Sequence, residues 1–168
     1  MALLTSRTTR IGRKILDVIT NTATDVASIG IGRFCDPMFT QLVTETLVWG
    51  VGIESVHEDV YSLPDEDNNE CVQLIMSYTL WTRGKASNPI GLDVMQETCF
   101  AAVDKMKDCL RFNPTLDGMI CRSHFGDEKM NPFSVQLDPL EVTCMCPVIC
   151  RCSIKEPYPG DYYCEPLE

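Results

Sequence analysis

Two segments of the chain place apolar residues at the spacing of an amphipathic helix. In residues 6–22, Ile11, Ile15, Val18 and Ile19 recur at helical intervals, and charged residues fill the positions between them. Residues 91–110 repeat the pattern with Val94, Met95, Thr98, Cys99, Ala102, Met106 and Leu110. Both segments are therefore predicted to be helices that bury one face.

Other segments alternate apolar and polar residues, as half-buried strands do. The strongest is residues 71–83, where Leu74, Met76, Tyr78 and Leu80 share one parity. The remaining predicted strands are residues 27–33, 47–61, 118–125 and 140–154. Loops or connectors are expected between them.

The strands at 47–61 and 71–83 are expected to pair as an antiparallel hairpin, because a short polar segment joins them. That segment contains Asp65, Glu66 and Asp67. Like charges are costly to bury without a partner, so we expect an exposed acidic tip. Calcium binding is the alternative, but the alternating ligand spacing of an EF-hand loop is missing. The tip is therefore predicted to hold no metal.

In chain order the predicted elements run α-β-β-β-α-β-β. This order is typical of an α+β domain in which two helices pack on one mainly antiparallel sheet. Residues 1–155 are expected to form this single domain. Residues 156–168 are rich in proline and tyrosine and show no core pattern, so we expect an extended C-terminal arm.

Charge is distributed unevenly along the chain. The 168 residues carry a formal net charge of −10, yet residues 1–33 hold five basic and two acidic side chains. In the first predicted helix, Arg7, Arg10, Arg13 and Lys14 form a candidate basic face between subunits; the alternative is a solvated helix face. The net negative charge argues against DNA or anionic lipid as a tight ligand, because both need clustered Lys and Arg.

Targeting signals are not apparent in the sequence. No apolar run approaches the roughly 20 residues that cross a bilayer. The N-terminus turns basic after its first apolar residues, which is the reverse of a secretory signal. We therefore expect synthesis in a cytoplasm and no membrane partner.

The chain contains ten cysteines: Cys35, Cys71, Cys99, Cys109, Cys121, Cys144, Cys146, Cys150, Cys152 and Cys164. They could be buried thiols, disulfides formed after release from the cell, or metal ligands. In an unbroken strand, the four within residues 144–152 share one face, where neighbours are too far apart for a mutual disulfide. Those four and Cys164 are therefore candidates for disulfides with another strand or another subunit.

No motif predicts a catalytic, cofactor-binding or metal-ligating residue. His57-Glu58-Asp59 lacks the second histidine of a zinc-protease helix and lies in a predicted strand. His124 has no cysteine that the sequence singles out as its partner. The chain also lacks a Walker loop and a Gly-X-Ser-X-Gly motif. We therefore expect no enzyme and no cofactor.

Several segments share their order and texture with one viral family. They are the helix Arg-Ile-Gly-Arg-Lys-Ile-Leu-Asp-Val-Ile, the strands Ile-Gly-Ile-Gly-Arg-Phe and Val-Gln-Leu-Ile-Met-Ser-Tyr-Thr-Leu-Trp, a helix containing Asp93, Glu97 and Ala102, and the closing Cys-Arg-Cys-Ser-Ile. Together, over residues 7–155, they resemble the tail terminator (tail completion) proteins of long-tailed bacteriophages. The high cysteine content and the C-terminal arm depart from the family pattern.

The resemblance implies a structural protein of the virion tail or neck, assembled in the host cytoplasm. In that family a small α/β sandwich forms a ring of six copies, which caps the tail tube and presents a surface to the head connector. The implied partners are further copies of the chain, tail-tube and sheath subunits, connector proteins, and DNA that passes through the lumen without specific binding. Alternatives from other classes are a thiol-dependent enzyme or redox protein, and a metal-binding module.

Overall fold

The structure, a computed structural model, describes residues 6–23, 30, 32–44, 46–59, 71–125, 131–132 and 139–155. The acidic tip Asp65-Glu66-Asp67, Cys164 and the C-terminal arm 156–168 lie outside the described residues. What the sequence predicts for them stays a prediction.

The helices and strands follow in the order α1 (Arg7–Thr22), β1 (Gly32–Phe34), the 3₁₀ turn η1 (Pro37–Phe39), β2 (Leu47–Asp59), β3 (Cys71–Lys85), α3 (Pro89–Phe112), β4 (Arg122–Phe125), β5 (Asn131–Pro132) and β6 (Glu141–Lys155). One sheet runs β1-β2-β3-β6-β4, with the short β5 also beside β6. β1 is parallel to β2, and the other neighbouring strands are antiparallel. The predicted α+β fold and element order are confirmed, and β5 is an addition to them.

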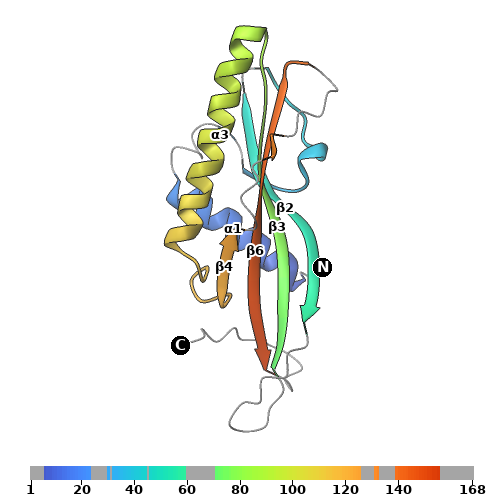
Figure 1. Ribbon diagram of the computed structural model, residues 1–168, viewed down its shortest axis with the longest axis vertical. Coiled ribbons are helices and arrows are strands. Elements are labelled where there is room, and N and C mark those ends of the chain that lie inside the picture. The colour runs from blue at the N-terminus through green and yellow to red at the C-terminus, as the bar shows by residue number, and fades with distance from the viewer. Residues whose placement is uncertain are drawn as a thin grey trace, which may run out of the picture.

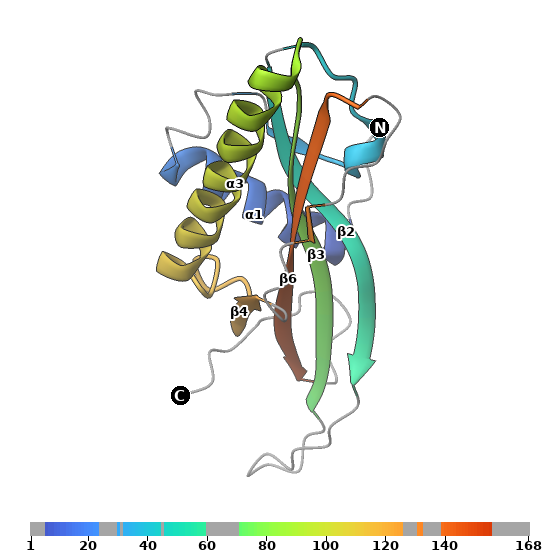
Figure 2. The same ribbon diagram turned by 45° about the horizontal axis from the view of Figure 1, so that its top comes forward.

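Both helices pack on one face of the sheet, which we call the inner face (Figures 1 and 2). α1 contacts β1 and β2, whereas α3 contacts mainly β3 and β6. The Tyr78 hydroxyl on β3 donates a 2.7 Å hydrogen bond to the Thr8 carbonyl of α1. The Thr82 hydroxyl, also on β3, donates to the Cys99 carbonyl of α3 at 3.1 Å. The central strand therefore ties both helices to the sheet.

The hydrophobic core lies between the helices and the inner face. Its largest fully buried side chains are Ile11, Ile15, Ile19, Trp49, Met76, Tyr78, Leu80, Met106, Leu110, Leu116 and Ile120. Burying one large apolar side chain contributes roughly 1.5–3 kcal/mol, so this layer supplies most of the stability. Successive strand residues point to opposite faces, so the intervening β3 residues Trp81 and Arg83 lie on the opposite, outer face.

Side-chain caps define where the helices begin. The Ser6 hydroxyl accepts a hydrogen bond from the first turn of α1, and the Asn88 side chain accepts one from the backbone N–H of Gly91 at 2.8 Å. Pro89 then opens α3, where its missing N–H is not needed. α3 therefore begins two residues before the predicted start and ends at Phe112.

The predicted strand at 118–125 is too long, because β4 covers only its last four residues. Residues 116–118 have φ angles of 50°, 58° and 81°, which are incompatible with an extended strand. The Asn113 side chain stabilises this turn by accepting a 2.9 Å hydrogen bond from the backbone N–H of Asp117. β1 covers 32–34 and so overlaps the end of the strand predicted at 27–33, while residues 24–29 and 31 lie outside the described part.

Gly50 on β2 lets the Trp81 ring lie against the outer face. A Cβ at Gly50 would collide with that ring and with the Arg33 carbonyl oxygen. Gly52, two residues on and on the same face, has space: its Cβ would be 3.5 Å from the nearest atom, the Cys35 carbonyl oxygen. A larger residue is therefore excluded at position 50 but has room at position 52.

We expect Gly50→Ala to destabilise the protein by about 1–3 kcal/mol, because overpacking must displace the Trp81 ring or the backbone. Gly52→Ala is the matched control and should change the free energy of unfolding by less than about 0.5 kcal/mol. Urea unfolding of the two variants and the wild type measures both values. Equal losses would contradict the packing of Trp81 on Gly50.

Candidate interaction surfaces

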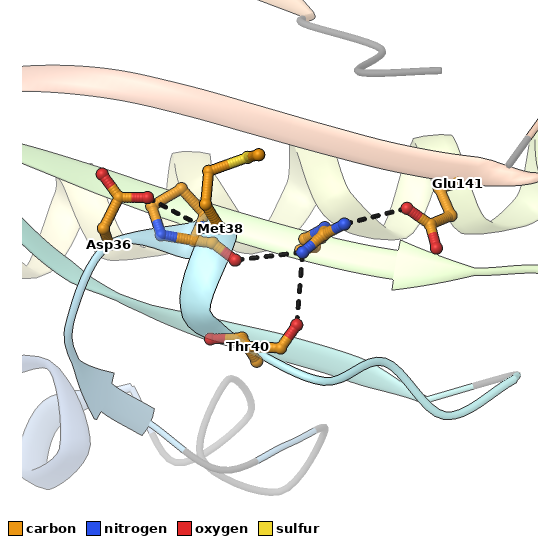
Figure 3. Close-up of polar contacts among 6 residues, drawn as sticks. Asp36, Met38, Thr40 and Glu141 are labelled. Atoms are coloured by element: carbon orange, nitrogen blue, oxygen red, sulfur yellow. Dashed lines mark hydrogen bonds and ion pairs between the residues drawn. The ribbon is translucent and has the colours of Figure 1, made fainter. Parts of the chain in front are cut away.

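Arg83, near the end of β3, is a charged side chain buried on the outer face, with 7% of the residue exposed. Its Nη1 donates to the carbonyl oxygens of Pro37 and Thr40 at 3.0 and 3.2 Å (Figure 3). Its Nη2 donates to Oε2 of Glu141, the first residue of β6, at 2.9 Å. The guanidinium is thus both neutralised and hydrogen-bonded, which is what allows a charge to be buried.

These contacts fix η1 across the outer face. Trp81 adds another, since its indole Nε1 donates to the Cys35 carbonyl at 2.8 Å. Within the turn, the Asp36 carboxylate accepts a 2.8 Å hydrogen bond from the backbone N–H of Met38 and caps η1 (Figure 3). Side chains of β3 therefore hold the backbone of η1, and the side chains of Met38 and Phe39 are not needed to hold it.

The held turn presents large apolar side chains to solvent. Met38 is 55% exposed and Phe39 86%, and Val43 in the same segment is 64% exposed. We call these three residues the η1 patch. Exposed apolar residues that cluster on one fixed segment are typical of a contact surface, because their backbone need not be ordered on binding.

α3 exposes a second apolar surface in its first two turns. Ile90 is 81% exposed and Val94 61%, and a spacing of four places them on the same face of the helix. We call this pair the α3 patch. Asp93 and Glu97 flank it, both exposed and without an ion-pair partner among the described residues.

The predicted basic face of α1 divides in two. Arg10 and Arg13 are exposed and make no ion pair within the described part of the chain. Lys14 instead pairs with Asp117, in the turn after α3, at 2.5 Å, and Arg7 is half-buried. The hydrogen bond from Lys14 lowers the pKa of the Asp117 carboxyl. Of the four predicted basic residues, Arg10 and Arg13 are thus the two that are exposed.

The cysteines of β6 lie side by side in the core, as strand alternation predicts. Cys144, Cys146, Cys150 and Cys152 are all buried on the inner face. Burial raises the pKa of Cys150 to about 12, so it stays protonated and unreactive at neutral pH. The hydrogen bond between Cys99 on α3 and Cys144, together with burial, raises the pKa of Cys99, and the same hydrogen bond lowers the pKa of Cys144. This arrangement favours the interpretation of these thiols as small apolar packing groups.

The other sequence candidates are not brought together. His57 is exposed on β2, and His124 is half-buried on β4, at the far edge of the sheet. Burial, with Arg151 and Arg122 nearby, lowers the pKa of His124. Within the described ranges, no cluster of His, Cys, Asp or Glu could hold a metal ion. The described helices include none long and apolar enough to cross a membrane.

Sequence analysis missed both apolar patches. It assigned Val94 to the buried face of the second helix, which is wrong, because α3 turns that residue to solvent. Ile90 lies before the predicted start of the helix, so its spacing of four from Val94 could not indicate that the two residues share a helix face. In the predicted loop at 34–46, the only sequence sign of the η1 patch was the adjacent apolar pair Met38 and Phe39 after Asp36-Pro37. A loop has no periodicity that tells whether such residues are buried or exposed, so their exposure is known only from the structure.

No protein-family model and no curated protein matches this sequence.

We expect Arg83→Met to destabilise the fold by about 3–5 kcal/mol, because it leaves Glu141 buried without its counter-charge. Arg111→Met is the control, since its ion pair with Asp108 is about half exposed and, with its cation–π contact to Phe125, contributes about 1–2 kcal/mol. Denaturant unfolding measures both losses. Adding Glu141→Leu to Arg83→Met should recover part of the loss, and no recovery would contradict the ion-pair account.

Cysteine reactivity should follow burial. In the folded chain, we expect iodoacetamide to modify half-buried Cys35 before the other cysteines whose burial the structure describes, and Cys144, Cys146, Cys150 and Cys152 only after unfolding. Peptide mass mapping over time measures the order. Rapid modification of the four β6 thiols in the native state would contradict their placement in the core.

Oxidation in an assembled particle is a separate question. The sequence makes the four β6 cysteines candidates for disulfides, whereas their burial favours packed thiols, so a disulfide in an assembled particle stays a prediction that depends on loss of the reducing cytoplasm. Particles denatured and alkylated without a reductant test it. Complete alkylation of all ten cysteines would leave no disulfide.

Proposed function

We propose that this chain is a structural subunit that assembles head to tail into a closed ring, as do the phage tail terminators that its sequence resembles. The observation that carries the proposal is that two of the exposed apolar surfaces, the η1 patch and the α3 patch, lie on opposite sides of one sheet. The η1 patch lies over the outer face, and the α3 patch belongs to the helix layer on the inner face (Figure 1).

Two different patches on one rigid subunit favour a heterologous contact. A two-fold dimer uses the same patch of both copies, so it would cover one kind of patch and leave the other in water. A head-to-tail contact uses both patches of every copy. When the rotation between copies closes, the result is a ring without an open end. Removing both apolar surfaces from water supplies the driving force.

Charge supports the same assembly. Exposed Arg33 offers positive charge on the outer face, because it pairs in register with Gly50, whereas exposed Asp93 and Glu97 offer negative charge in the helix layer, so copies can attract through unlike surfaces. The net charge of −10 would limit capture of DNA phosphates in a central channel. From the family resemblance we propose six copies, a place in the virion tail or neck, and contacts with tail tube, sheath and connector proteins.

Native mass spectrometry of the purified chain, alone and mixed with tail tubes of the parent particle, tests the proposal. We expect a species of six copies under at least one of the two conditions. Raising the salt concentration should weaken the charge contribution but retain the ring, because apolar burial is not screened. A strict monomer under both conditions would contradict the proposed function.

A further inference from the structure

We infer that the η1 patch of one subunit seats on the α3 patch of the next, an inference that rests on the ring proposed above. The occupant of each surface is therefore a second copy of this chain. Phe39 is the central projecting side chain, and Ile90 and Val94 form the surface that receives it. Three features of the structure support this pairing over other contacts.

The first feature is the height of the two patches along the molecule. Arg83, which holds η1, precedes Pro89, the first residue of α3, by six positions, so both patches are attached to the same end of β3. Figures 1 and 2 show η1 and the start of α3 in the same half of the long axis, on opposite sides of the sheet, with the first turn of α3 nearer the tip. A contact between the two patches is therefore a head-to-tail contact, and it produces a ring when the rotation between copies closes.

The second feature is the flanking charge. Arg33 on β1 pairs in register with Gly50, whose missing Cβ faces Trp81, so Arg33 belongs to the outer face that carries η1. It is exposed and has no ion-pair partner in the described part of the chain. The α3 patch is flanked by Asp93 and Glu97, which are likewise exposed. Asp36, three residues before Phe39, accepts a hydrogen bond from the backbone N–H of Met38, and Glu141 is paired with Arg83.

The third feature is pre-organisation. The η1 backbone is held by hydrogen bonds from Arg83 and Trp81, and the α3 backbone by its own helix and the Asn88 cap. Docking then orders only the Met38, Phe39, Ile90 and Val94 side chains. A large aromatic side chain on a fixed backbone is typical of the few residues that dominate binding energy.

A mixing experiment with two full-length variants tests the pairing. Phe39→Glu spoils the η1 patch and leaves the α3 patch intact, whereas Val94→Glu does the reverse. Both residues are mostly exposed, so each variant is expected to fold, which circular dichroism and thermal unfolding check. Phe112→Glu is the matched control, since Phe112 is 86% exposed, as Phe39 is, but lies at the other end of α3.

Under the conditions in which the wild type forms rings, each variant alone should lose them, with association weakened about tenfold or more. Phe112→Glu should retain them. An equimolar mixture of Phe39→Glu and Val94→Glu should then form a heterodimer and stop there, because the mixture contains one intact pairing per two chains. Native mass spectrometry separates these species by their masses.

The outcomes distinguish this inference from the proposed function. If both variants still form rings as the wild type does, the pairing of the two patches is wrong, but the proposed ring is unaffected. Variants that lose the ring but form no heterodimer on mixing would also overturn it, since the patches would then contact something other than each other. A wild type that never associates would sink the proposed function itself, and the pairing with it.

Discussion

The outer half of this structure depends on the buried Arg83 guanidinium. Removing such a charge from water costs several kcal/mol, and the cost is offset only when the geometry of its partners is good. Its acceptors come from two separate segments, the carbonyls of Pro37 and Thr40 in and after η1 and the carboxylate of Glu141 on β6. None of them can move far without leaving the guanidinium unsatisfied. A single side chain therefore couples the position of the η1 turn to the start of the last strand.

β3 extends this coupling to the whole domain, because its residues alternate between the two faces. Tyr78 and Thr82 reach inward and hydrogen-bond to the backbones of α1 and α3. Trp81 and Arg83 reach outward and hydrogen-bond to the backbone around η1. The strand also lies at the centre of the sheet order, between β2 and β6. The two helices, the neighbouring strands and the η1 turn are thus all attached to β3. This attachment fixes the positions of surfaces on opposite sides of the sheet relative to each other.

Regular periodicity made most of the fold predictable from sequence. The apolar spacing in α1 and the alternation in β3 and β6 reflect burial of one face, and a buried face leaves a repeating trace in the sequence. The turn at 116–118 has no such sequence pattern, because its positive φ angles are stabilised by the Asn113 side chain and tertiary contacts rather than by a glycine at each position. The two patches were unpredictable for a related reason. Whether Val94 or Cys99 faces the core depends on where the helix sits on the sheet, and spacing alone does not decide it.

The exposure of the η1 patch is not required by the fold. The turn is held through backbone carbonyls, a carboxylate cap and the buried Pro37, so polar residues at positions 38, 39 and 43 would leave every one of those contacts unchanged. Single exposed apolar residues are common on protein surfaces, but here they cluster on a turn that a buried charge keeps rigid. A surface that none of these contacts requires is consistent with the association proposed above. In a closed ring each copy would cover this surface on its neighbour, and the rigidity that Arg83 imposes would then serve assembly rather than stability alone.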